Sequence, residues 1–109
     1  MPGAKLIVLY PSPRDPMAFE RVYADDHVPM VTTENFKGMT RFVGTKVVGT
    51  PDGSPSPFQR IAELHFPSME VLQAATASPG AQKAVAHAIE ISTGGKPVFL
   101  VAEEEVRTF

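Results

Sequence analysis

The chain has 109 residues, of which 43% are hydrophobic and 20% charged, and its net charge is -2 at pH 7. This composition is typical of a single globular domain over residues 1–109, and it argues against disorder and against a nucleic-acid partner. The lack of cysteine excludes disulfides and thiolate chemistry, and no apolar run reaches the roughly 18 residues of a membrane span. Because the first residues also lack a signal-peptide layout, we expect a cytoplasmic protein without a membrane partner.

The first predicted elements are a strand and a helix. The strand covers Lys5–Tyr10, and its alternating residues are apolar on both faces, which is typical of a strand that is covered on both sides. Asp15 then provides an N-cap and Pro16 a first helical residue. The helix is expected to end just after His27, because Pro29 follows.

Two further strands are predicted next, joined by a turn. The second strand runs from Gly38 to about Val48, with Gly44 as a candidate bulge. Turn-forming residues at 50–55 lead into the third strand, over Arg60–Phe66. Strict alternation on this third strand places Glu63 and His65 on one face, together with Ile61.

The last predicted elements are an interrupted helix and a strand. The helix begins at Ser68 and is rich in alanine, and Ser78 and Pro79 interrupt it before a second part over Ala81–Ile91. A kinked or split helix is therefore expected. The final strand covers residues 96 to about 103.

The element order β-α-β-β-α-β predicts an α+β, ferredoxin-like fold. In this fold a four-stranded antiparallel sheet carries both helices on one face, and the first and third strands are central. The first strand is nevertheless apolar on the other face, and small monomers seldom leave such a surface in water. We therefore expect a homodimer through the open face of the sheet, a dimeric α+β barrel with a cleft in each half.

The topology also predicts a cluster of polar side chains at one end of the sheet. The first helix and the third strand should both finish there, which brings His27 and His65 to one mouth. Arg41 starts from the same end, and Tyr23 lies one helical turn before His27. Imidazole exchanges protons near neutrality, and a helix C-terminus favours its protonated form. A pair of His27 and Glu63 beside an apolar cavity would form an acid/base unit.

Structural roles for the same residues stay open. His27 could be a helix-end residue satisfied by a carbonyl, and Tyr23 could belong to the core. Glu63 and His65 could form a salt-linked pair at a dimer interface, and Arg41 could be a solvated charge. His87, in the alanine-rich helix, is expected on the surface. The three histidines have no zinc-ligand spacing, so no metal site is expected.

Three segments resemble the EthD family of small dimeric α+β-barrel proteins: Lys5–Tyr10, Phe19–Met30 and Arg60–Phe66. The most specific match is Tyr-x-x-x-His-Val-Pro, over residues 23–29. The resemblance implies the same fold and dimer. It also implies cofactor-independent enzymes that isomerise lactones, or that cyclise, dehydrate or oxidise aromatic and polyketide-like molecules and are often called oxidoreductases.

The resemblance also assigns positions. It places the family's histidine at His27 and its acidic strand residue at Glu63. The chain departs from the family pattern at residues 32–39, where a Pro-Gly-Leu approach to the second strand is absent, and at His65, which is often aromatic in the family.

The leading hypothesis is an enzyme that acts on a small, mostly apolar metabolite with a carbonyl, lactone or phenolic oxygen, without a metal or organic cofactor. His27 would carry the proton and Glu63 would orient it or act as partner base. The substrate would contact residues from both helix and sheet: Tyr23, Arg41, Ile61 and His65. One alternative is a non-catalytic protein that binds a small hydrophobic ligand, and another is a cofactor-free or haem-using oxygenase.

Overall fold

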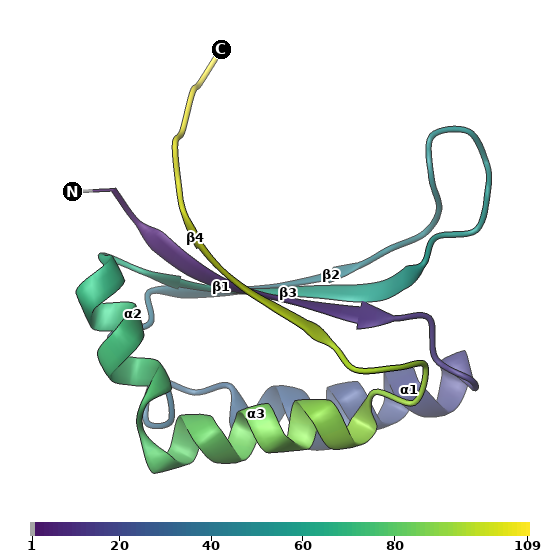
Figure 1. Cartoon of the computed structure of the whole chain (residues 1–109), viewed down its shortest axis with the longest axis horizontal. Coiled ribbons are helices and arrows are strands. Elements are labelled where there is room, and N and C mark those ends of the chain that lie inside the picture. Colours follow the sequence, from purple (N-terminus) through teal and green to yellow (C-terminus); the bar gives the residue numbers. More distant parts are fainter. Residues whose placement is uncertain (1) are drawn as a thin grey trace.

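The computed structural model describes residues 2–109 and confirms the α+β, ferredoxin-like architecture (Figure 1). The strands are β1 (Ala4–Pro11), β2 (Arg41–Lys46), β3 (Phe58–Phe66) and β4 (Val98–Glu103). The helices are α1 (Pro16–Val22), α2 (Met69–Thr76) and α3 (Pro79–Ile91), and α1 continues into the π-helical turn η1 (Tyr23–His27) and the 3-10 turn η2 (Val28–Met30).

The four strands form one antiparallel sheet in the order β2-β3-β1-β4, so β1 and β3 are central as expected. Figure 1 shows α1, α2 and α3 on the same side of this sheet. The other side carries no helix of the described chain. The C-terminal segment and the loop between β2 and β3 both project from that helix-free side (Figure 1).

Each helix start uses the signal expected from the sequence. The side chain of Asp15 accepts a hydrogen bond from the backbone N–H of Ala18, and Pro16 follows as the first helical residue. Ser68 and Ser78 cap α2 and α3 in the same way. The interruption at Ser78 separates two helices, which confirms the split expected from the serine and proline at this point.

The second strand differs from its predicted extent. It covers only Arg41–Lys46, while Gly38 adopts a positive φ of 89° in the preceding turn, where glycine is favoured. The pairing of β2 with β3 is continuous through Gly44, which lies opposite Ala62, so Gly44 forms no bulge.

The core lies between the sheet and the helices. Alternate residues of β1 and β3 supply its sheet side, including Leu6, Val8, Ala62 and Leu64, and all four are buried. α3 presents small side chains to this layer, among them the buried Ala84, so the helix can approach the sheet closely. Within residues 2–109, no helix is both long and apolar enough to traverse a bilayer.

Candidate active site

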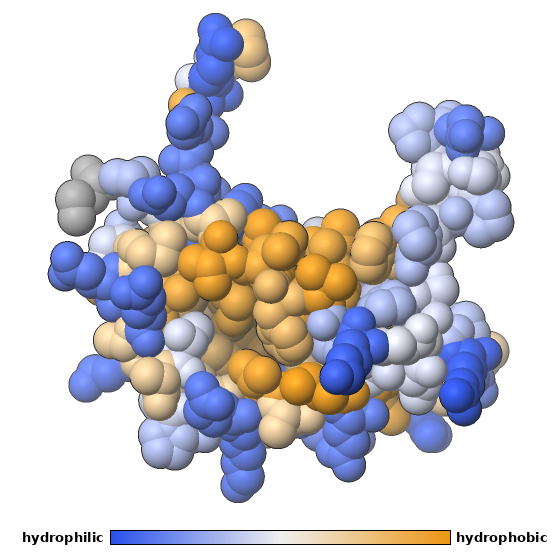
Figure 2. Space-filling view, in the orientation of Figure 1, coloured by the Kyte–Doolittle hydropathy of each residue, from blue (hydrophilic) through white to orange (hydrophobic). Residues whose placement is uncertain are grey.

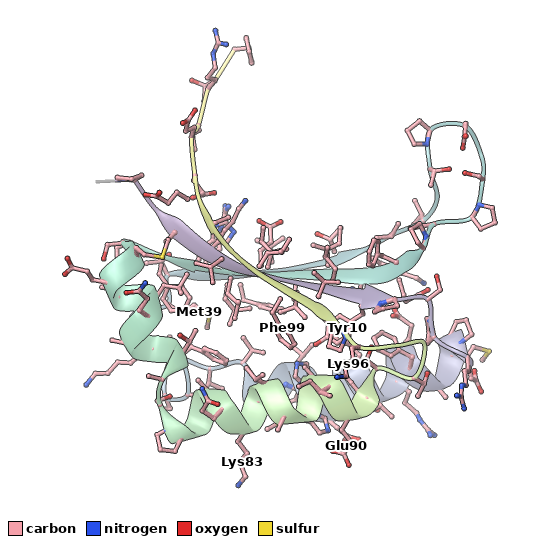
Figure 3. The ribbon with its side chains drawn as sticks, in the orientation of Figure 1. Tyr10, Met39, Lys83, Glu90, Lys96 and Phe99 are labelled. Carbon is pink, nitrogen blue, oxygen red and sulfur yellow. The ribbon has the colours of Figure 1, made fainter. Side chains whose placement is uncertain are left out.

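A cavity lies in the layer between the sheet and the helices. It leaves about 20 Å³ for the centre of a water-sized molecule, which is room for one water. Its lining is mostly apolar and comes from every layer of the fold: Leu6, Val8, Val31, Phe36, Phe42, Ala62, Leu64, Ala84, Val85 and Phe99. Three polar side chains complete the lining, namely Tyr10, Tyr23 and His27. Figure 3 shows Tyr10 and Phe99 pointing from the sheet into this layer.

The π-helical turn places two of these polar side chains. Over Tyr23–His27 the backbone winds more widely than an α-helix, and the N–H of Val28 donates to the carbonyl of Tyr23. Both Tyr23 and His27 are buried against the sheet, with exposed fractions of 3% and 6%. Single π turns of this kind often occur at functional sites. The turn directs both side chains of the Tyr-x-x-x-His motif into the cavity layer.

His27 is held by hydrogen bonds at both ring nitrogens. Its Nε2 lies 3.1 Å from the hydroxyl of Tyr10 on β1, and its Nδ1 lies 3.0 Å from Nδ1 of His87 on α3. The rings of His27 and His87 stack, with centroids 5.2 Å apart and planes inclined by 19°. Tyr10 is fully buried, whereas His87 is half-buried. His27 thus lies between the apolar cavity and a side chain that reaches the surface.

Burial keeps His27 uncharged at neutral pH. Loss of water around the ring, with a smaller contribution from His87, lowers the pKa of His27 from 6.5 to about 4. The expectation that the helix terminus would favour the protonated ring is therefore wrong, because desolvation outweighs the helix dipole here. Burial also raises the pKa of Tyr10, which stays a neutral phenol. The site holds neutral donors and acceptors at neutral pH.

Tyr23 carries a hydroxyl with no hydrogen-bond partner among the described residues, although the atom is buried. This hydroxyl lies next to Gly44 on β2, where a Cβ would be in ordinary van der Waals contact with it, 3.6 Å away. The guanidinium of Arg60 lies 5.0 Å above the Tyr23 ring and donates two hydrogen bonds to Glu20, of 2.7 and 3.1 Å. The ring is fixed, while its polar end is unsatisfied. A buried polar group without a partner is costly and points to a missing ligand or water.

Glu63 lies on the opposite face of the sheet from His27. Its carboxylate accepts a 2.9 Å hydrogen bond from Lys5, which lowers the pKa of Glu63. His65 Nε2 lies 3.3 Å from the same carboxylate oxygen without hydrogen-bond alignment, and its Nδ1 lies 3.5 Å from Glu104. Lys5 also lies 3.7 Å from Glu104. We call these four residues the open-face ion cluster.

His27, Glu63 and His65 therefore do not meet at one end of the sheet beside a shared cavity, as expected from the sequence. Both strand residues point to the helix-free face, because alternation on β3 turns them away from Ala62 and Leu64, which line the cavity. The expectation considered which end of the sheet each residue reaches and not which face it occupies. Of the pair considered as an alternative for Glu63 and His65, the structure shows the contact, with 3.3 Å between His65 Nε2 and the Glu63 carboxylate. Its place at a dimer interface stays a prediction.

Two other expected substrate contacts also lie on the helix-free face. Arg41 is exposed and pairs with His65 across β2 and β3, and Ile61 is half-buried on β3. Neither residue lines the cavity. Of the six residues proposed from the sequence, the structure brings only Tyr23 and His27 to the cavity.

Sequence reasoning missed two partners of His27. Tyr10 was taken as the end of an apolar strand, yet its even-numbered register with Leu6 and Val8 directs it to the helix side. His87 was expected on the surface, but it follows Ala84 by three residues and so shares the inward side of α3. Among residues 2–109, no group of three or more histidine and carboxylate side chains is arranged to hold a metal ion.

Comparison with known proteins agrees with this fold. The model of the EthD domain matches residues 12–90. An uncharacterized 11.0 kDa protein from the thcB-thcC intergenic region of Rhodococcus erythropolis is 32% identical over 102 residues, covering 94% of this chain and 96% of that protein. The crystal structure of an EthD family protein from Bacillus halodurans is 29% identical, with a TM-score of 0.84 over 94% of this chain and 99% of that one.

A more distant structure shares the fold alone. The hydroxynitrile lyase from Passiflora edulis is 18% identical and has a TM-score of 0.68, with 99% of this chain and 97% of that chain covered. The domain match spans more than half of the chain and includes the segment that carries Tyr23 and His27. The protein therefore belongs to the EthD family.

Proposed function

We propose that the protein is a small enzyme that performs acid/base chemistry, without a metal or organic cofactor, on a compact and mostly apolar molecule with a carbonyl, lactone or phenolic oxygen. The observation that carries this proposal is a neutral, buried His27 in the same apolar cavity as an unpartnered Tyr23 hydroxyl. Apolar cavities with a few converging polar groups are typical of ligand sites. The hydroxynitrile lyase shows that this fold can house an enzyme.

The roles within the cavity follow from which groups are free. Tyr23 offers its hydroxyl to the oxygen of the ligand, because that hydroxyl has no other partner. His27 takes or returns the proton through the Tyr10 hydroxyl, which is hydrogen-bonded to its Nε2. Glu63 has no part in this step, since its carboxylate is paired with Lys5 on the other face. Apolar walls supply the remaining contacts.

The cavity must enlarge before such a molecule can bind. Its present space suits one water, and its half-buried lining residues include Val85 on α3 and Phe99 on β4. Movement of these two side chains would open the layer between the sheet edge and α3. A haem group would need a free axial ligand, and both ring nitrogens of His27 are already hydrogen-bonded. The geometry therefore favours a small organic ligand.

The proposed working unit is a homodimer formed through the helix-free face. That face carries half-exposed apolar residues at its centre and edge, including Ile7, Ile61 and Leu100. Figure 2 shows apolar surface between two hydrophilic projections, the C-terminal segment and the loop between β2 and β3. A second copy seated between the projections would remove this apolar surface from water.

The function is tested by turnover of a panel of lactones and substituted phenols. We expect His27→Gln to lower the rate on the order of 100-fold or more, which is typical of losing a general acid or base. Glu63→Gln serves as the matched control, assayed at a protein concentration at which it assembles as the wild type does. It should then leave the rate nearly unchanged, because Glu63 lies on the opposite face of the sheet from the cavity. Undiminished rates in the His27 variant would remove this residue from the chemistry.

The same assay distinguishes an enzyme from a ligand carrier. A carrier would bind phenols in the wild type, with an affinity that barely changes with pH, and it would turn none of them over. Since the pKa of His27 is about 4, the enzyme should keep a level rate between pH 6 and pH 8 and lose activity on acidification. A rate that rises steeply between pH 6 and pH 8 would contradict a neutral His27 as the proton acceptor.

A further inference from the structure

We propose that Tyr10, His27 and His87 form a proton relay that connects the apolar cavity to solvent on the side of α3, with His87 as its outer end. The inference rests on the proposed acid/base function, but it concerns a residue with no place in the cavity lining. His87 does not contact the space where a ligand would bind. It therefore acts through His27, as a relay residue.

The relay is continuous in the structure. The hydroxyl of Tyr10 lies 3.1 Å from Nε2 of His27, and Nδ1 of His27 lies 3.0 Å from Nδ1 of His87. Each distance is within the range of a hydrogen bond, so one proton occupies each gap. The three groups come from β1, η1 and α3, and they span the layer from the sheet to the outer helix. No further side chain is required to complete the path.

The two ends of the relay lie in different surroundings. Tyr10 is fully buried and lines the cavity, whereas His87 is half-buried. The charged neighbours of His87 on α3, Lys83 one turn before and Glu90 one turn after, are exposed. Figure 3 shows both of them pointing away from the sheet. The free nitrogen of His87, Nε2, is the atom of the relay that can exchange with bulk water.

The proton balance is simple because every group begins and ends neutral. A proton from the ligand joins the Tyr10 oxygen as the proton of Tyr10 moves to Nε2 of His27. The Nδ1 proton of His27 then moves to Nδ1 of His87, and the Nε2 proton of His87 leaves to water. The reverse sequence delivers a proton to the ligand. Only the tautomers of the two imidazoles change.

The arrangement answers a difficulty of the buried site. An imidazole whose pKa lies far below 7 does not hold an extra proton for long, and the mostly apolar cavity beside it has room for one water only. A path to solvent lets each proton leave without a stable charged intermediate. The groups that face His27 are Tyr10 from β1, Tyr23 from its own turn and His87 from α3, and none of them is a carboxylate or an ammonium that would hold a charge on the ring.

The test measures proton exchange and needs no substrate. The ring N–H of His27 is observed by nitrogen-15 NMR of the intact protein, and its exchange with water is timed at pH 7. In His87→Gln, an amide fills the place of the ring and can still hydrogen-bond to His27, but it cannot pass a proton on. We expect exchange to slow by about tenfold or more, because a placed acid/base group typically speeds proton transfer by about 100-fold or more.

Tyr10→Phe is the matched control, since it removes the cavity end of the relay and leaves the outer end in place. Exchange at His27 should stay close to the wild-type rate in this variant. Equal exchange in His87→Gln and the wild type would overturn the relay, and so would equal slowing in both variants. Backbone amide exchange of α3 is followed in parallel, and slowing at His27 supports the relay only when these amides exchange as in the wild type.

A second variant keeps the test decisive if the glutamine disturbs α3. In His87→Ala, free imidazole added to the buffer can occupy the vacated place and restore exchange in proportion to its concentration. An increase with imidazole supports the relay, and indifference to imidazole overturns it. A working relay without turnover of any lactone or phenol would refute the proposed substrates alone, while turnover with His87-independent exchange would refute the relay alone.

Discussion

The polar side chains on the two faces of the sheet differ in charge and in burial. On the helix-free face, Lys5, Glu63 and Glu104 are ionised groups that compensate one another around His65. On the helix-covered face, Tyr10, Tyr23 and His27 are neutral. Burial raises the pKa of both tyrosines and lowers that of His27, and each shift favours the neutral form. One face balances charge, and the other excludes it.

The difference separates the proposed interface from the proposed chemical site. Paired charges with about a quarter of each side chain exposed, as at Lys5 and Glu63, contribute little energy and suit a surface that a second copy covers. A neutral histidine next to an unsatisfied hydroxyl has the opposite character, because it can accept a proton and a ligand. Changes on one face should therefore alter assembly, and changes on the other should alter proton chemistry.

The largest expected effect comes from a charge at the centre of the helix-free face. Ile7 lies between Glu63 on β3 and Leu100 on β4 in the sheet register. Ile7→Glu would bury a carboxylate beside an existing one when a second copy covers this face. We expect the dimer to weaken by about 100-fold or more, since an uncompensated buried charge costs several kcal/mol and about 1.4 kcal/mol is tenfold in affinity.

Sedimentation velocity over a range of protein concentrations measures this change. Ile89→Glu is the control, because Ile89 is also exposed and apolar, at 47%, but it lies on α3. This variant should assemble as the wild type does. If Ile7→Glu assembled normally while Ile89→Glu did not, the contact between copies would involve α3 and not the sheet.

The next effect is the pH dependence of stability that arises from His27. The unfolded chain binds a proton at this side chain near pH 6.5, while the folded chain does so only near pH 4. Stability from this residue is therefore complete above pH 6.5, falls as the pH drops towards 4, and is level below that. The full loss is on the order of 3 kcal/mol, at about 1.36 kcal/mol for each pKa unit.

Urea unfolding between pH 7.5 and pH 4.5, at a fixed protein concentration, measures this loss. The pKa values of Glu20 and Glu63 are lowered by their hydrogen bonds to Arg60 and Lys5, so these carboxylates contribute mainly below this range. In His27→Gln the decline of stability over the same range should largely disappear. An equal decline in both proteins would show that another group causes it.

The fold could be predicted from the sequence because its signals are local. Asp15 with Pro16, and Ser78 with Pro79, start their helices where expected, and alternation on β1 and β3 identifies two central strands. The second strand was overestimated because Gly38 looks like its start, whereas its positive φ belongs to a turn. An N-cap therefore fixes the start of a helix reliably, whereas the ends of this strand have no comparable local signal.

Only half of the candidate site could be predicted, because the site depends on which face of the sheet each strand residue occupies and on contacts between elements that are distant in the sequence. The Tyr23 and His27 motif is a single turn of backbone, and it could be identified directly. His87 meets His27 across 60 residues of sequence, and only the packing of α3 on η1 brings their rings together. The pairing of Glu63 with His27 was wrong because a strand residue reaches one face only, and Ala62 and Leu64 already occupy the inner one.

The smallest expected effect distinguishes the two tyrosines within the cavity. Tyr23→Phe removes a hydroxyl that has no described partner. We therefore expect the stability of this variant to equal that of the wild type within about 1 kcal/mol, or to be slightly higher. Tyr10→Phe deletes the hydrogen-bond partner of His27 Nε2, and leaving that nitrogen unpaired should cost about 1–3 kcal/mol. Urea unfolding at pH 7.5 compares the two variants.

Phenol binding should depend on Tyr23 even though stability does not. In Tyr23→Phe the affinity for phenol should be lower by up to about tenfold, for one lost hydrogen bond. A larger loss of stability in Tyr23→Phe than in Tyr10→Phe would mean that the Tyr23 hydroxyl is already satisfied in the folded protein, and its proposed contact with the ligand oxygen would then have to displace an existing partner.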